Sequence, residues 1–154
     1  MKRFTPILLF IIISFLVGYF SMLLQAESMI LWYPNLTISS LTPSGYVFSI
    51  VWSVLYLLMG IAAGIIWSMR TIYSMVMTVI FFLQLALNFF WSYFFFYMRS
   101  PGSGLAVLTL LLAVVVIYVV ACYKQNRLSA YLNFPYVIWL LYAIYLNAFV
   151  VINN

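Results

Sequence analysis

The charged side chains of this chain are spaced so that long apolar stretches lie between them. They are Lys2, Arg3, Glu27, Arg70, Arg99, Lys124 and Arg127. A hydrocarbon core about 30 Å thick requires about 20 apolar residues for each spanning helix, and the uncharged stretches are long enough for that. Charged residues make up 5% of the chain, against about 25% in soluble domains. The bilayer must therefore be the solvent of this protein.

The apolar stretches predict an all-α integral membrane protein, a five-transmembrane-helix bundle that forms a single transmembrane domain over residues 1–154. The predicted helices cover about residues 5–24, 46–68, 72–97, 105–123 and 130–152, and a long loop covers residues 25–45. Backbone polar groups in hydrocarbon need internal partners, which leaves helices or a closed barrel. The apolar runs do not alternate as barrel strands do, so helices are expected.

The distribution of positive charge predicts the orientation. With five spans, Lys2, Arg3, Arg70, Lys124 and Arg127 fall on one face, whereas Arg99 and Glu27 fall on the other. The positive-inside rule then predicts a cytoplasmic N-terminus, with the long first loop and the C-terminus outside, most simply in a bacterial cell membrane. The basic residues form no stripe and no aromatic-basic module, so no nucleic-acid partner is predicted.

The residue inventory excludes the common catalytic and metal sites. The chain has no His and no Asp, a single Glu and a single cysteine, Cys122. A carboxylate pair, a His-based triad and a metal site of His, Asp or paired Cys are therefore impossible. We predict no catalytic residue, no metal and no required cofactor, and a binding protein rather than an enzyme. No acidic residue or His lies mid-span, which disfavours proton-coupled transport.

Aromatic and amide side chains share faces of three predicted helices. These sets are Phe48, Trp52 and Tyr56; Gln84, Asn88, Trp91 and Phe95; and Trp139, Ala143 and Leu146, with Asn147 at the edge. One interpretation is interhelical packing with amides that hydrogen-bond across helices. The other is a cavity for a flat apolar ligand, with stacking surfaces and a few amide donors. Spacing alone leaves both open.

At these residues the chain resembles the translocator protein family (TspO/MBR), also called tryptophan-rich sensory proteins or peripheral benzodiazepine receptors. The matching segments are 32–36 with Thr42–Pro43, then 48–56, 84–92 and 135–147, in order over nearly the whole chain. The chain departs from the family pattern at Ser39 and Ser44, where Pro is usual, near Leu41, where a Trp is usual, and at Ser49, where Gly is usual. The family's C-terminal sterol motif is missing.

The resemblance implies a five-helix bundle that is commonly a homodimer. It implies binding of porphyrins (protoporphyrin IX and haem intermediates) and of benzodiazepine- and isoquinoline-type ligands in a pocket under the first loop. By motif position the ligand-binding residues are Tyr33, Pro43, Trp52, Tyr56, Asn88, Trp91, Trp139, Ala143 and Leu146. The three tryptophans would stack on the ligand and Asn88 would anchor a polar edge. Without His to hold iron, free-base porphyrin is favoured.

Three functions stay open at this point: a receptor or sensor, a transporter of tetrapyrroles or other apolar ligands, and an enzyme of light- and oxygen-dependent porphyrin degradation.

Two further motifs are ambiguous. Gly60 and Gly64 form a GxxxG that serves either a dimer contact or packing inside the monomer. Tyr118 and Lys124 loosely fit a short cholesterol pattern, from which we predict only weak cholesterol binding.

Overall fold

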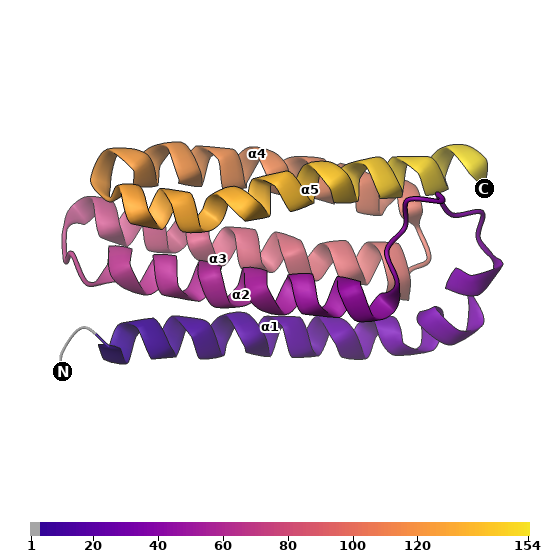
Figure 1. The fold of residues 1–154 in the computed structure, drawn as a ribbon, viewed down its shortest axis with the longest axis horizontal. Helices are drawn as coiled ribbons and strands as arrows, with labels where there is room; N and C mark the ends of the chain where they lie inside the picture. The colour runs from indigo at the N-terminus through magenta and orange to yellow at the C-terminus, as the bar shows by residue number, and fades with distance from the viewer. Residues whose placement is uncertain (1–3) are drawn as a thin grey trace.

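Five long helices form an elongated bundle in a computed structural model, which describes residues 4–154 (Figure 1). The helices are α1 (Phe4–Leu31), α2 (Gly45–Trp67), α3 (Ile72–Ser92), α4 (Pro101–Gln125) and α5 (Arg127–Asn153). A short 3₁₀ helix, η1 (Tyr33–Asn35), follows α1, and a π-helical turn, η2 (Tyr93–Tyr97), extends α3. All five long segments are apolar enough to cross a membrane. The predicted all-α membrane fold is confirmed.

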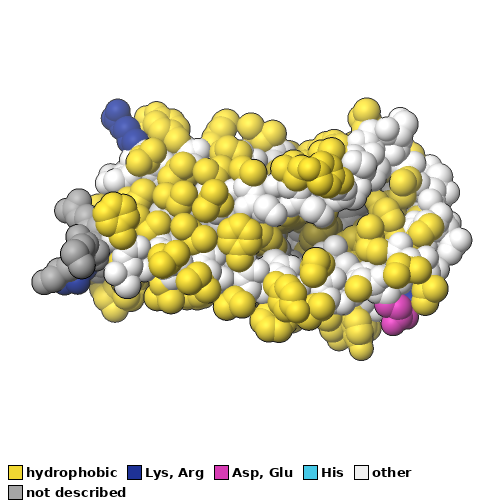
Figure 2. Space-filling model, turned by 60° about the horizontal axis from the view of Figure 1, so that its bottom comes forward, with side chains coloured by type: hydrophobic (Ala, Val, Ile, Leu, Met, Phe, Trp, Pro, Cys, Tyr) yellow, Lys and Arg dark blue, Asp and Glu magenta, His cyan; other side chains and the backbone are white. Residues whose placement is uncertain are grey.

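The outer surface of the bundle is apolar along its length. Large side chains such as Leu8, Val79 and Ile138 are each more than half exposed, and hydrophobic atoms dominate the face shown in Figure 2. The described charged residues lie at the ends of the helices, with Glu27 at one end. This surface suits lipid rather than water, as expected for a multi-pass membrane protein.

The first helix is longer than the sequence predicted. It continues to Leu31 rather than ending at residue 24, so the predicted loop 25–45 begins only after that residue. Gln25 and Ser28 looked like loop residues because they are polar. In the fold, Gln25 Nε2 donates to Ser92 Oγ at 3.0 Å, and Ser28 Oγ donates to the carbonyl of Phe96 at 2.6 Å. These contacts satisfy their polarity inside the bundle.

Two other helix starts also differ from the prediction. α4 begins at Pro101 rather than at residue 105, because proline suits the first helical position, where its missing N–H is not needed. α5 begins at Arg127 rather than at residue 130. Its N-cap is Asn126, whose Oδ1 accepts from the Ser129 amide at 3.0 Å, an arrangement typical of asparagine at a helix start.

The GxxxG glycines bring α1 and α2 together. A Cβ added at Gly60 would lie 2.5 Å from the Cα of Ile11, and one at Gly64 would collide in the same way with Ile7. Only glycine permits such an approach of two backbones. Packing inside the monomer therefore accounts for the motif, and these glycines are not available as a contact with a second copy.

The helices surround the site in a fixed order. α1 packs on α2 and α3, whereas α5 packs on α2 and α4. The first loop, between η1 and the start of α2, crosses the end of the bundle near the C-terminus (Figure 1). The candidate site is enclosed by this loop and by the parts of α1, α2, α3 and α5 that lie nearest to it.

Candidate ligand-binding site

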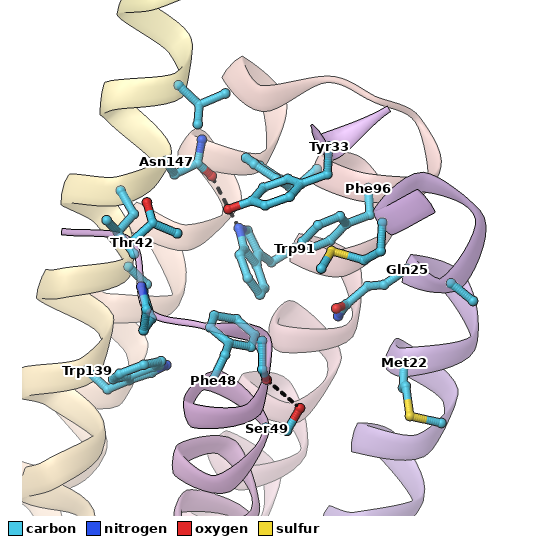
Figure 3. A pocket seen from close by; sticks show the side chains of 18 of the residues that line it. Met22, Gln25, Tyr33, Thr42, Phe48, Ser49, Trp91, Phe96, Trp139 and Asn147 are labelled. Atoms are coloured by element: carbon cyan, nitrogen blue, oxygen red, sulfur yellow. Dashed lines mark hydrogen bonds between the residues drawn. The ribbon is translucent and has the colours of Figure 1, made fainter. Parts of the chain in front are cut away.

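A cavity of about 530 Å³ lies beneath the first loop (Figure 3). Its walls come from α1, α2, the junction of α3 with η2, and α5. They are formed by Met22, Leu23, Gln25, Ala26, Met29, Tyr33, Thr42, Pro43, Gly45, Phe48, Ser49, Trp91, Phe95, Phe96, Trp139, Ala143, Leu146, Asn147 and Val150. The volume falls within the range of about 300–1,000 Å³ found for small-molecule sites. The lining is mostly apolar and contains no charged side chain.

Aromatic rings form much of the cavity wall. Phe48 and Trp139 lie on one side with ring centroids 5.7 Å apart, and Trp91 lies 5.9 Å from Phe95 on the other. Behind this wall, Trp52 stacks on Trp91 at 6.1 Å with an interplanar angle of 23°. Side chains packed in this way hold one another in place, so the cavity presents preformed faces for a flat ligand.

Hydrogen bonds fix one tryptophan, Trp91, whereas the indole N–H groups of two others have no acceptor in the described part of the chain. Trp91 Nε1 donates to Asn147 Oδ1 at 3.2 Å (Figure 3). Asn147 Nδ2 in turn donates to the carbonyl of Pro101 at 2.8 Å. The buried indole N–H groups of Trp139 and Trp52, by contrast, have no acceptor within residues 4–154. A buried donor without a partner costs about 1–3 kcal/mol. A ligand acceptor near Trp139, which lines the cavity, would recover that energy.

Tyr33 adds a third polar group. It lies in η1, and its hydroxyl points into the cavity above Trp91 (Figure 3). Burial raises the pKa of Tyr33 above its ordinary value of 10.0, because removal from water disfavours the phenolate. The hydroxyl therefore stays neutral at physiological pH and can donate a hydrogen bond.

A second cavity of about 250 Å³ adjoins the first, between α1, α2 and α3. The two share Phe48, Ser49 and Trp91 among their lining residues. Further down, the second cavity is lined by Tyr56 and Asn88. The two cavities therefore lie side by side, one beneath the loop and the other toward the middle of the bundle.

The predicted ligand-binding residues divide between the two cavities. Tyr33, Pro43, Trp91, Trp139, Ala143 and Leu146 line the larger one, whereas Trp52, Tyr56 and Asn88 line only the smaller one. Asn88 is 1% exposed, accepts from the Tyr56 hydroxyl at 2.9 Å and donates to the Tyr136 hydroxyl at 3.0 Å. Both ends of its amide thus already have partners, which gives Asn88 a role in holding two tyrosines. Asn147, placed at the edge by its spacing, lines the larger cavity, as does a second amide, Gln25 of α1.

The sequence reasoning missed the contribution of α1. Met22, Gln25 and Met29 line the larger cavity, yet the predicted first helix ended at residue 24. A signal was present, because Ser21 and Ser28 lie seven residues apart, on one helical face, and both are buried. That spacing continues the helix past Gln25.

Polar contacts with α5 hold the first loop over the cavity. Tyr142 donates to a loop carbonyl, and Tyr145 shares a hydrogen bond of 3.1 Å with Ser39. Asn154 pairs with both backbone groups of Thr37, accepting from its N–H at 2.8 Å and donating to its C=O at 3.1 Å. At Ser39, where the family usually has proline, the serine hydroxyl thus provides a tether to α5.

Comparison with known proteins agrees with this architecture. The family model described as TspO/MBR matches residues 9–152. The "Tryptophan-rich protein TspO" of Archaeoglobus fulgidus is 32% identical over 138 residues, which is 90% of each chain. The "Translocator protein" of Homo sapiens is 34% identical over 75% of this chain and 70% of its own. The "Tryptophan-rich sensory protein" of Cereibacter sphaeroides is 31% identical over 75% and 72%. A match over nearly the whole length, on a five-helix bundle with an aromatic cavity, shows that this chain belongs to the TspO/MBR family of membrane proteins.

Proposed function

We propose that this chain is a membrane-embedded receptor that binds porphyrins, with free-base protoporphyrin IX as the leading ligand, in the cavity beneath the first loop. The observation that carries the proposal is the aromatic cavity of about 530 Å³ with an unpartnered indole N–H in its wall. The family relationship supports a role as a sensor or translocator. The same cavity suits the benzodiazepine- and isoquinoline-type ligands that the resemblance implies.

The chemistry of the cavity fits a planar apolar molecule with polar groups at one edge. The rings of Trp91, Trp139 and Phe48 provide faces, and the Tyr33 hydroxyl and the Trp139 N–H provide donors. The lining has no cation to neutralise a buried carboxylate. The two acidic side chains of protoporphyrin would therefore extend past the first loop, where water solvates them.

Binding can be tested with single tryptophan substitutions. Trp139→Phe and Trp91→Phe keep an aromatic face but lose part of the stacking and the N–H. Aromatic contacts contribute about 0.5–1.5 kcal/mol, so each change should weaken protoporphyrin IX binding about 2- to 12-fold. Quenching of tryptophan fluorescence in detergent measures the affinity. Trp67 is the matched control, because it lies at the other end of α2, is 44% exposed and is absent from the cavity wall.

The control decides the interpretation. Trp67→Phe should leave the affinity unchanged. If it weakens binding as much as Trp139→Phe and Trp91→Phe do, the porphyrin is partitioning onto aromatic surface and the cavity is not its site.

A carrier function is the second candidate, and the smaller cavity favours it. That cavity is bordered by Phe15 and Tyr19 of α1, both exposed on the outer face of the bundle. Figure 2 shows a recess in one face of the bundle, toward the end with Glu27. Such an opening would let an apolar ligand exchange with the bilayer. A flux assay in vesicles separates the two functions, because a receptor binds porphyrin without accelerating its movement between vesicle and medium.

For the orientation we propose a cytoplasmic N-terminus. Arg70, Lys124 and Arg127 lie in or beside the α2–α3 and α4–α5 turns, at one end of the bundle, whereas Arg99 pairs with Glu27 at the other end. The remaining cations of the prediction, Lys2 and Arg3, lie outside the described residues. Reporters active on only one side of a bacterial membrane, fused to each terminus, test this; an external N-terminus would contradict it.

We also propose a homodimer, as the family resemblance implies. Since α1 packs directly against Gly60 and Gly64, the dimer contact must use another surface of the bundle. Light scattering of the purified protein in detergent measures the oligomeric state, and a monomer at all concentrations would exclude the dimer.

A further inference from the structure

A third cavity lies on the outside of the bundle, at the end opposite the first loop. Its volume is about 380 Å³, and it runs between the beginning of α3 and the end of α4. It is lined by Tyr73, Met77, Val116, Ile117, Val120, Ala121, Lys124 and Gln125. On α4 the lining extends over nine residue steps, which is about 13 Å along the helix axis. The cavity is therefore a groove that runs along the helices.

The groove is divided into an apolar part and a polar end. The apolar part is formed by Met77, Val116, Ile117, Val120 and Ala121, of which Ile117 and Val120 are each more than half exposed on the outer surface. Lys124 and Gln125 lie in the last turn of α4 and form the polar end. In a bilayer the apolar part faces acyl chains, and the polar end lies toward the head groups.

The positive charge at this end has no counter-charge within the protein. Glu27 is the only acidic residue of the chain, and it pairs with Arg99 at the other end of the bundle at 2.9 Å. Within residues 4–154, the other cations at this end of the bundle are Arg70 and Arg127, which repel rather than neutralise it. No side-chain carboxylate can therefore partner Lys124, and its counter-ion must come from outside the chain.

We propose that this groove is a binding site for one anionic phospholipid. An acyl chain lies along the apolar part from Val116 to Val120, and the phosphate lies against the Lys124 ammonium, with the Tyr73 hydroxyl and the Gln125 amide as further donors. A zwitterionic lipid presents the same acyl chain but carries a compensating positive charge. Charge complementarity at Lys124 thus selects the anionic lipid.

The sterol interpretation of this region does not fit the fold. The short cholesterol pattern requires Tyr118 and Lys124 to act on one ligand, yet Tyr118 is 1% exposed and faces the core, whereas Lys124 is exposed. A ligand in the groove contacts Lys124 and Ala121 without reaching the hydroxyl of Tyr118. The site therefore provides a phosphate partner at its polar end, but the tyrosine of the sterol pattern, Tyr118, does not line it.

Native mass spectrometry of the purified protein, titrated with phosphatidylglycerol or phosphatidylcholine, tests the proposal. The unaltered protein should bind one phosphatidylglycerol at least several-fold more tightly than phosphatidylcholine. Lys124→Gln should weaken that binding about fivefold, the equivalent of about 1 kcal/mol for one cation at the membrane surface. Ala121→Phe should displace the lipid by filling the groove. Arg127→Gln removes the same charge outside the groove lining and should leave the binding unchanged.

Three results would overturn the proposal. Equal losses in Lys124→Gln and Arg127→Gln would mean diffuse attraction to the whole positive end. Equal affinity for the two lipids would remove the selection by charge. A change of oligomeric state in Ala121→Phe and Lys124→Gln, with the lipid count unchanged, would assign the groove to a second copy of the chain. Thermal unfolding verifies that each variant is folded, and the exposed position of Lys124 keeps that variant informative if Ala121→Phe is not.

Discussion

Replacing Asn88 by alanine tests whether its side-chain amide stabilises the fold or binds the ligand. The Asn88 side chain joins the hydroxyls of Tyr56 and Tyr136 at 2.9 and 3.0 Å and is 1% exposed. Its removal leaves both hydroxyls without these partners in the middle of the bundle. Hydrogen bonds between membrane helices average about 0.6 kcal/mol, and an unsatisfied buried group costs about 1–3 kcal/mol. We therefore expect Asn88→Ala to lower the free energy of unfolding by about 1–3 kcal/mol.

Unfolding in mixed detergent micelles, followed by circular dichroism, measures this loss. Tyr56→Phe and Tyr136→Phe each remove one partner, so a double-mutant cycle with Asn88→Ala isolates each hydrogen bond. Porphyrin affinity, measured on the folded fraction by tryptophan quenching, should fall less than twofold, because Asn88 does not line the larger cavity. A several-fold loss of affinity with unchanged stability would refute the reasoning and make Asn88 a ligand contact.

Other substitutions test the remaining features of the fold. Gly60→Leu combined with Gly64→Leu should prevent the close packing of α1 on α2, so thermal unfolding should show an unfolding temperature lower by many degrees. Light scattering should show that the oligomeric state of the remaining folded protein is unchanged. Glu27→Gln removes an ion pair whose side chains are 43% and 75% exposed, so stability in detergent should change by less than about 1 kcal/mol; a larger loss would contradict this. Tyr142→Phe removes one tether of the first loop and should accelerate hydrogen exchange in residues 37–42, with no change in the α4 amides.

The helical architecture is determined by properties that need no tertiary structure. The length of each apolar stretch between charges sets the number of spans, because hydrocarbon thickness acts on each segment separately. The 3.6-residue period then groups Trp91 with Asn88, and Trp139 with Ala143, on shared faces. These two rules predicted five helices and a set of aromatic residues that the fold places around two adjoining cavities.

The sequence did not determine which polar group meets which partner. Gln25 looked like a loop residue because its polarity is unfavourable in lipid, but Ser92 of α3 satisfies it and the helix continues. Asn88 and Asn147 looked alike as amides beside aromatic residues, yet one joins two tyrosines and the other orients Trp91. The partner of a polar side chain depends on the register and tilt of neighbouring helices, which are fixed by contacts between residues far apart in the chain. In a membrane, where water cannot serve as a substitute partner, that tertiary choice decides whether a polar residue ends a helix, holds the bundle together or faces the cavity.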